Sequence, residues 1–143
     1  MERAELLSFL RAQKWAVQAS VSPLGAPQAA AIGIVVTDRL EIVFDTFGDS
    51  RKAHNLKQNP KIALVVGWDD GQTVQYEGVA DEPRGEELEQ LKALYFARFP
   101  DGRERERLPN ITYFRIRPSW LRYSDFRGPE PVLFTLEGAE LPA

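Results

Sequence analysis

The segment FDTFGDSRKAHNLKQNP, residues 44–60, decides how the rest of the chain is arranged. Its pattern indicates the end of a strand, a turn, and a short helix over residues 50–58. The Ser50 hydroxyl is a suitable N-cap, because it can accept a hydrogen bond from a backbone N–H group of the first turn. The sequence therefore places Arg51 and Lys52 beside unpaired N–H groups at the start of this helix.

Two cations at the start of a helix do not stabilise that helix. The macrodipole makes this end positive, so that Arg51 and Lys52 each cost about a few tenths of a kcal/mol when exposed. A bound anion reverses the sign, since free N–H groups, a hydroxyl, a guanidinium and an ammonium group suit the oxygen atoms of a phosphate monoester. The spacing alone leaves two interpretations: a phosphate site, or two solvated cations screened by Asp49.

Several landmarks follow one another with fixed gaps along this stretch. They are Phe44-x-Thr46, Ser50-Arg51-Lys52, Asn55-Leu56, Asn59-Pro60-Lys61 and the strand IALVV that comes next. In this order they resemble the flavin-phosphate segment of the pyridoxamine 5'-phosphate oxidase-like FMN-binding split-barrel family, and looser similarity extends over residues 5–125. The resemblance implies that Ser50, Arg51 and Lys52 hold the FMN phosphate, that Thr46 lies beside the flavin ring, and that a homodimer completes the site.

The resemblance also implies where the flavin ring lies. Its expected contacts are backbone groups of Ala30, Ala31, Ile32, Asp45 and Thr46. Small side chains in residues 27–36 fit the close approach of a flat ligand or of another subunit, and they equally fit a tightly packed barrel wall. Gln75 is a weaker candidate for the flavin edge, with an exposed strand glutamine as the alternative.

The length and composition bound the class of protein. With 143 residues, 43% of them apolar and 27% charged, we expect a single domain over residues 1–143 with its own core. Residues 1–13 are expected to form an N-terminal helix and residues 127–143 a C-terminal extension. The longest apolar run, residues 29–36, is too short to cross a bilayer, and no signal peptide is evident at the N-terminus. We therefore expect a cytoplasmic protein without a membrane partner.

The residue counts also exclude several kinds of site. Cysteine is absent and His54 is the single histidine, which excludes thiolate and multi-histidine metal sites as well as cysteine nucleophiles. The formal net charge of −3 argues against a surface that follows a nucleic-acid backbone. Basic residues concentrated near Arg51, Lys52, Lys57 and Lys61 suit one small anion better than a polymer. No metal and no nucleic-acid partner is expected.

Hydrophobic periodicity predicts the fold class. Strands are expected over residues 15–21, 27–36, 40–46, 62–68, 73–80, 111–117 and 120–126, and helices over residues 2–13, 50–58 and 84–99. Helices are inserted singly and no regular strand–helix repeat occurs, so a doubly wound sheet is not supported. The expected fold is mainly β with flanking helices (α+β), a six-stranded antiparallel split β-barrel of the FMN-binding type.

Individual segments carry more specific expectations. Residues 15–21 alternate as a strand with one face buried, and residues 62–68 read as a strand buried on both faces. The alternating charges of residues 103–107 indicate a solvated loop. Residues 118–119 are expected to separate the last two strands, and the apolar island at residues 132–136 to add an edge strand or to pack on a partner.

The sequence departs from the family pattern where pyridoxine phosphate binds. The family's Arg-x-x-x-x-Lys pair is replaced by apolar residues at 30–35, and Ser124 and the GPEP segment stand where substrate-binding Trp, His and Arg residues are found. Vitamin B6 oxidation is therefore not expected. The resemblance implies an FMN-dependent oxidoreductase that transfers a hydride or electrons between the flavin and an unidentified small molecule, with NAD(P)H as candidate donor.

Other functions remain open because no proton donor or other catalytic residue can be assigned. One alternative is a flavin-binding carrier or stress-related sensor without turnover. Another keeps the barrel and changes the cofactor to a deazaflavin or haem. Haem is the least favoured, since His54 is the one side chain that could readily ligate iron.

Overall fold

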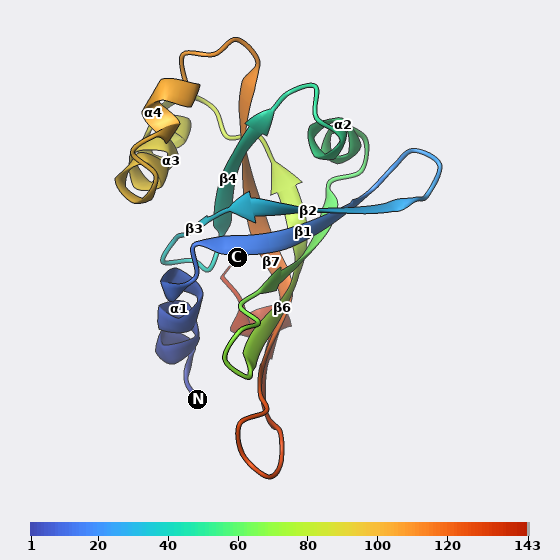
Figure 1. Cartoon of the computed structure of the whole chain (residues 1–143), viewed down its shortest axis with the longest axis vertical. Helices are drawn as coiled ribbons and strands as arrows, with labels where there is room; N and C mark the ends of the chain where they lie inside the picture. Colours follow the sequence, from blue (N-terminus) through green and yellow to red (C-terminus); the bar gives the residue numbers. More distant parts are fainter. Residues whose placement is uncertain (143) are drawn as a thin grey trace.

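One antiparallel sheet, curled into a split barrel with helices at its rim, makes up the computed structural model, which describes residues 1–142 (Figure 1). The strands are β1 (Trp15–Val21), β2 (Pro27–Gly33), β3 (Val35–Val36), β4 (Ile42–Phe47), β5 (Lys61–Val66), β6 (Gln72–Asp81), β7 (Ile111–Asp125) and β8 (Val132–Glu137). The helices are α1 (Arg3–Ala12), α2 (Arg51–Gln58), α3 (Gly85–Arg98), α4 (Gly102–Arg105) and a final 3₁₀ turn (Gly138–Glu140). None of the helices within residues 1–142 has the length and hydropathy that a membrane span requires.

The expected fold class, a mainly β antiparallel split barrel with flanking helices, is confirmed. The strands follow the order β2-β1-β5-β6-β7-β4-β3, and β8 pairs with β7. The sheet has eight strands rather than six: residues 27–36 divide into β2 and β3, the apolar island forms the edge strand β8, and the segments expected at 111–117 and 120–126 form the single strand β7. The sheet curls so that β2, at one end of this path, contacts β4, the strand before the other end, without pairing with it; the barrel is split at this point.

The last two expected strands are one continuous strand, β7, so the predicted break at residues 118–119 is wrong. Pro118 pairs with Gly78 of β6, and the register shifts between Glu77 and Gly78. The extra residue at this shift is Ser119, so β7 itself bulges beside a proline that has no N–H group to donate. Because β7 continues through it, the strand spans the sheet and pairs with β4, β6 and β8.

The barrel interior is apolar and is crossed by one buried tyrosine. Tyr76 of β6 is fully buried, and its Oη donates to the carbonyl oxygen of Leu40 at 2.7 Å and approaches that of Ile116 at 3.1 Å. Burial raises the pKa of this hydroxyl well above its ordinary value. The contacts join the turn before β4 to β7 across the core.

The strand β1 buries its polar face. Ala16, Gln18 and Ser20 point to the interior and are almost fully buried, whereas Trp15 on the other face is 54% exposed. This reverses the usual assignment, in which the apolar face of a strand turns inward. The reason is that α2 packs on the inner side of β1 and presents the buried amide of Asn55 to it.

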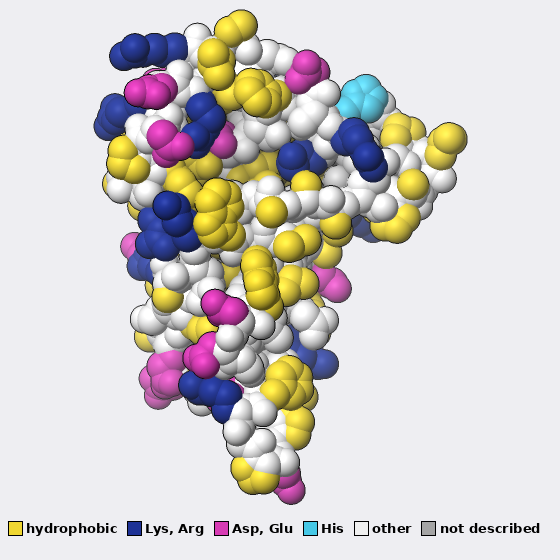
Figure 2. Space-filling model, viewed as in Figure 1, with side chains coloured by type: hydrophobic (Ala, Val, Ile, Leu, Met, Phe, Trp, Pro, Cys, Tyr) yellow, Lys and Arg dark blue, Asp and Glu magenta, His cyan; other side chains and the backbone are white. Residues whose placement is uncertain are grey.

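The strand β5 also has an uncovered face, so the expectation that residues 62–68 are buried on both faces is wrong. Ile62, Leu64 and Val66 are buried, and the alternate positions are exposed. Two of the exposed residues of β5 are apolar. With neighbours on β1 and β2 they form what we call the outer apolar face, which consists of Trp15, Val17, Ala31, Ala63 and Val65. Figure 2 shows hydrophobic side chains gathered in the middle of the surface that β1 and β2 present.

Residues 102–105 form α4, so the solvated loop expected for residues 103–107 is wrong. Arg105 reaches from α4 to Asp45 of β4, where its Nε donates to Oδ2 at 3.1 Å. Tyr95 of α3 donates its hydroxyl to the other oxygen of Asp45 at 3.0 Å. The Asp45 side chain is 11% exposed, and these contacts fix α3 and α4 on the sheet.

Candidate functional site

The start of α2 is capped as the sequence predicts. Ser50 Oγ accepts a hydrogen bond from the backbone N–H of Ala53 at 3.2 Å and lies 3.0 Å from Oγ1 of Thr46 on β4. No acidic residue occupies the first turn of α2, where Arg51 and Lys52 stand. The positive end of the helix dipole therefore coincides with two cationic side chains.

Asn55 fixes α2 to the hairpin formed by β1 and β2. Its Nδ2 donates to Ser20 Oγ at 3.1 Å and to Gln28 Oε1 at 2.9 Å, and the residue is 3% exposed. Both bonds connect residues that are far apart in the sequence. They set how closely the first turn of α2 approaches the two strands.

A cavity of about 230 Å³ lies between the first turn of α2 and this hairpin. The side chains that line it are cationic, polar or very small: Gln18, Ser20, Gln28, Ala29, Ala30, Arg51 and Lys52. Figure 2 shows Lys and Arg side chains over the junction of α2 with β2. We call this space the α2 cavity.

The charges of the α2 cavity have no counter-ion among residues 1–142. Burial lowers the pKa of Lys52 from its ordinary value, because the ammonium group loses solvent and gains in return only a 3.5 Å contact with Thr46 Oγ1. Arg51 is exposed and makes no side-chain hydrogen bond or ion pair with any residue in 1–142. An anion in the cavity would offset both deficits.

A buried acceptor in the α2 cavity also lacks a partner. Gln18 is 1% exposed, and its Oε1 makes no hydrogen bond to any residue of the described part of the chain. An unsatisfied buried polar atom costs about 1–3 kcal/mol. Such an atom, in a cavity with two cations, suits a ligand that brings both an anionic group and hydroxyl donors.

The structure brings together only part of the predicted site. Ala30, Arg51 and Lys52 line the α2 cavity, and Ser50 and Thr46 lie at the adjoining helix start.

The other predicted residues lie elsewhere. Ile32 is buried in the barrel core, and the carboxylate of Asp45 is bound by α3 and α4. Ala31 and Gln75 are exposed on the outer side of the sheet. Ala31 pairs with Val17 and Gln75 pairs with Val65, both of which belong to the outer apolar face. Within one chain, the sheet therefore separates Gln75 from the start of α2.

Four lining residues were not predicted: Gln18, Ser20, Gln28 and Ala29. For Gln18 and Ser20 the signal was present in the alternation of residues 15–21, whose polar set faces inward. A strand that turns its polar side toward the core needs polar partners or a ligand there.

Comparisons with known proteins identify the family. A family model described as pyridoxamine 5'-phosphate oxidase matches residues 3–125. The chain belongs to the pyridoxamine 5'-phosphate oxidase-like family. The matched part includes the whole of α2 and all the residues that line the α2 cavity.

Solved structures share the fold at low sequence identity. A haem-binding protein from Mycobacterium smegmatis has a TM-score of 0.82 and 15% identity, and the match covers 98% of this chain but 60% of that one. The haem storage protein HutZ from Vibrio cholerae has a TM-score of 0.72, 21% identity and coverage of 96% and 97%. A pyridoxamine 5'-phosphate oxidase-related, FMN-binding protein from Nostoc punctiforme has a TM-score of 0.67, 14% identity and coverage of 95% and 96%. A search of curated proteins gave no significant match.

We expect Arg51→Ala to weaken the binding of FMN about 10- to 100-fold, because a charge-assisted hydrogen bond to the phosphate, worth about 1.5–3 kcal/mol, is lost. Quenching of flavin fluorescence on titration measures the affinity. Lys57→Ala is the matched control, since it removes a cation from the last turn of the same helix. Equal affinities of the Arg51 variant and the unaltered protein would place the phosphate elsewhere.

Proposed function

We propose that this protein binds FMN, with the phosphate group at the start of α2, and acts as an oxidoreductase on a small molecule. The observation that carries the proposal is the α2 cavity. Within the described residues, two cations without a counter-ion, the free N–H groups of a capped helix and an unpaired buried acceptor converge on one space. Helix N-termini of this kind bind phosphate groups readily.

The chemistry of FMN fits these residues part by part. Arg51 would bind phosphate oxygens through its planar fork, Lys52 would add a point charge, and Ser50 would keep the first turn open toward the ligand. The ribityl chain next to the phosphate carries hydroxyl groups, and one of them would donate to the unpaired Oε1 of Gln18. Ala30 leaves room for the chain to pass along β2 toward the split of the barrel.

A second copy of the chain would complete the site. The α2 cavity is smaller than the roughly 300–1,000 Å³ of typical ligand pockets, so one chain holds the phosphate end but not the whole cofactor. The outer apolar face is exposed in one chain, and such a face suits burial against a partner. Gln75 and Ala31 lie on that side, where they could approach the flavin bound by the partner. We therefore propose a homodimer.

The protein's part in the reaction is to bind and orient. Bound FMN would supply the hydride or electron transfer at its ring. Arg51 and Lys52 anchor one end of the cofactor, and the low solvent content around Lys52 strengthens that contact. The contact of Tyr95 and Arg105 with Asp45 holds α3 and α4 beside the split between β2 and β4. NAD(P)H is the proposed electron donor, and no catalytic residue is assigned.

Haem is a second candidate cofactor, because two proteins with this fold, from Mycobacterium smegmatis and Vibrio cholerae, are named as haem-binding or haem storage proteins. The chain offers iron one imidazole, His54, which lies exposed on α2 with its Nε2 3.5 Å from Nε2 of Gln58. The α2 cavity suits a phosphate better than a porphyrin. Flavin is therefore the cofactor that the geometry favours.

Reconstitution separates these functions. The cofactor-free protein is titrated with FMN, a deazaflavin and haemin, and the absorption bands of each complex are recorded. We expect a tight one-to-one FMN complex that NADPH or NADH reduces in stopped-flow experiments. Binding without reduction by either donor would instead indicate a carrier or sensor. Binding of haemin but not FMN, with loss on His54→Ala, would contradict the proposal.

We expect Gln18→Leu to act in opposite directions on stability and binding. It removes an unsatisfied buried acceptor, so the cofactor-free protein should melt about 3 °C higher, equivalent to roughly 1 kcal/mol. It also removes the proposed acceptor for a ribityl hydroxyl, so FMN should bind about 10-fold more weakly. Gln90→Leu, at an exposed position of α3, should change neither quantity. A lower melting temperature together with unchanged FMN affinity would show that Gln18 serves only the fold.

A further inference from the structure

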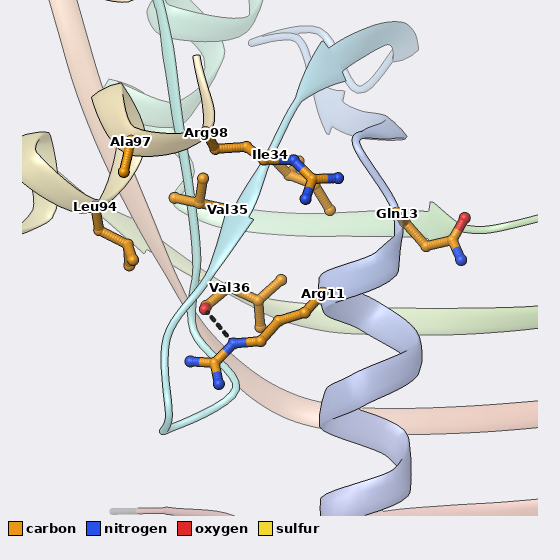
Figure 3. A pocket seen from close by; sticks show the side chains of 8 residues that line it. All are labelled: Arg11, Gln13, Ile34, Val35, Val36, Leu94, Ala97 and Arg98. Carbon is orange, nitrogen blue, oxygen red and sulfur yellow. Dashed lines mark hydrogen bonds between the residues drawn. The ribbon is translucent and has the colours of Figure 1, made fainter. Parts of the chain in front are cut away.

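A second cavity, of about 290 Å³, lies between α1, β3 and α3 (Figure 3). Its lining consists of Arg11, Gln13, Ile34, Val35, Val36, Leu94, Ala97 and Arg98. None of these residues lines the α2 cavity. We call this space the α1–α3 cavity.

The floor of the α1–α3 cavity is apolar and rigid. Ile34, Val35 and Val36 are buried, and β3 is the terminal strand of the sheet at this point. Leu94 and Ala97 extend the apolar surface along α3, and Leu94 is 37% exposed. A partly exposed apolar surface of this kind can bury the body of a small ligand.

Two arginines stand at the cavity from opposite sides, Arg11 from α1 and Arg98 from α3 (Figure 3). Arg11 is fixed by the protein: its Nε donates to the carbonyl oxygen of Val36 at 3.1 Å and its Nη2 to Asp38 at 2.8 Å. Arg98 makes no hydrogen bond or ion pair with any other residue from 1 to 142. The guanidinium group of Arg98 therefore has N–H donors that no residue from 1 to 142 accepts.

The edge of β3 adds a backbone donor. Thr37 N–H donates to the carbonyl of Glu41 at 2.9 Å, which makes Thr37 and Glu41 a hydrogen-bonded pair. Hydrogen-bonded and non-bonded pairs alternate in an antiparallel ladder, so Val36 directs its N–H and C=O groups away from β4. The carbonyl oxygen of Val36 accepts the hydrogen bond from Arg11, and the N–H group of Val36 points to the same side, toward the cavity.

We propose that the α1–α3 cavity binds a small carboxylic acid with an apolar body, such as a medium-chain fatty acid. The guanidinium group of Arg98 binds the carboxylate, and the body lies on Val35 and Leu94. The planar fork of arginine matches a carboxylate. An amine would be repelled by both arginines, and a bare phosphate would leave the apolar floor uncovered. The proposal is independent of the FMN proposal.

The test uses octanoate as the probe, measured by isothermal titration calorimetry with the full chain, both alone and in the presence of FMN. We expect octanoate to bind and 1-octanol, which has the same chain but no charge, to bind at least about 10-fold more weakly. Equal binding of the two, no binding of octanoate, or displacement of FMN by octanoate would overturn the proposal.

Variants locate the binding. Arg98→Ala should weaken octanoate about 10- to 100-fold, and Arg107→Ala, an exposed arginine outside the cavity, should not. Ala97→Phe fills the cavity and should abolish binding, with a thermal melt to show that the variant is folded. Octanoate affinity that is unchanged in both Arg98→Ala and folded Ala97→Phe would show that the ligand lies elsewhere.

Discussion

The two hydrogen bonds from the buried amide of Asn55 are the constraint on which the site depends. They join α2 to Ser20 and Gln28, on the two strands of the first hairpin. Because a buried amide without partners is costly, the helix has one favoured position on the hairpin. That position leaves the first turn of α2, with Arg51 and Lys52, facing Gln18 and Ala30 across a cavity rather than packed against them. The helix is thus attached through its middle and free at its positive end.

The same attachment determines which side of the sheet is apolar. The inner positions of β1 are Gln18 and Ser20, since they face a polar helix and a cavity, so the apolar positions of this strand point outward. The outer apolar face is therefore a consequence of how the site is built. Because the inner face of β1 carries the polar side chains that line the cavity, the apolar side chains of this strand lie on the outer surface of the sheet. In the proposed homodimer, a second copy of the chain would cover this surface and supply Gln75.

The sequence predicted what local interactions determine. The Ser50 cap, the extent of α2 and the alternation of most strands depend on neighbouring residues, and the split-barrel fold class followed from the family resemblance. Contacts between distant residues were not predictable in this way. The Gln18 and Gln28 lining depends on a pairing of strands with a helix about 30 residues away, and the contact of Arg105 with Asp45 spans 60 positions. The continuity of β7 through Pro118 depends on its register against β6, in which Ser119 of β7 has no partner.

The central claim is that the phosphate group anchors the cofactor at the start of α2. The most direct measurement compares the dissociation constants of FMN and riboflavin, which share the ring and the ribityl chain and differ in the phosphate alone. Because Arg51 and Lys52 would each make a charge-assisted contact, we expect FMN to bind at least about 100-fold more tightly than riboflavin. Equal affinities for the two flavins would contradict the claim.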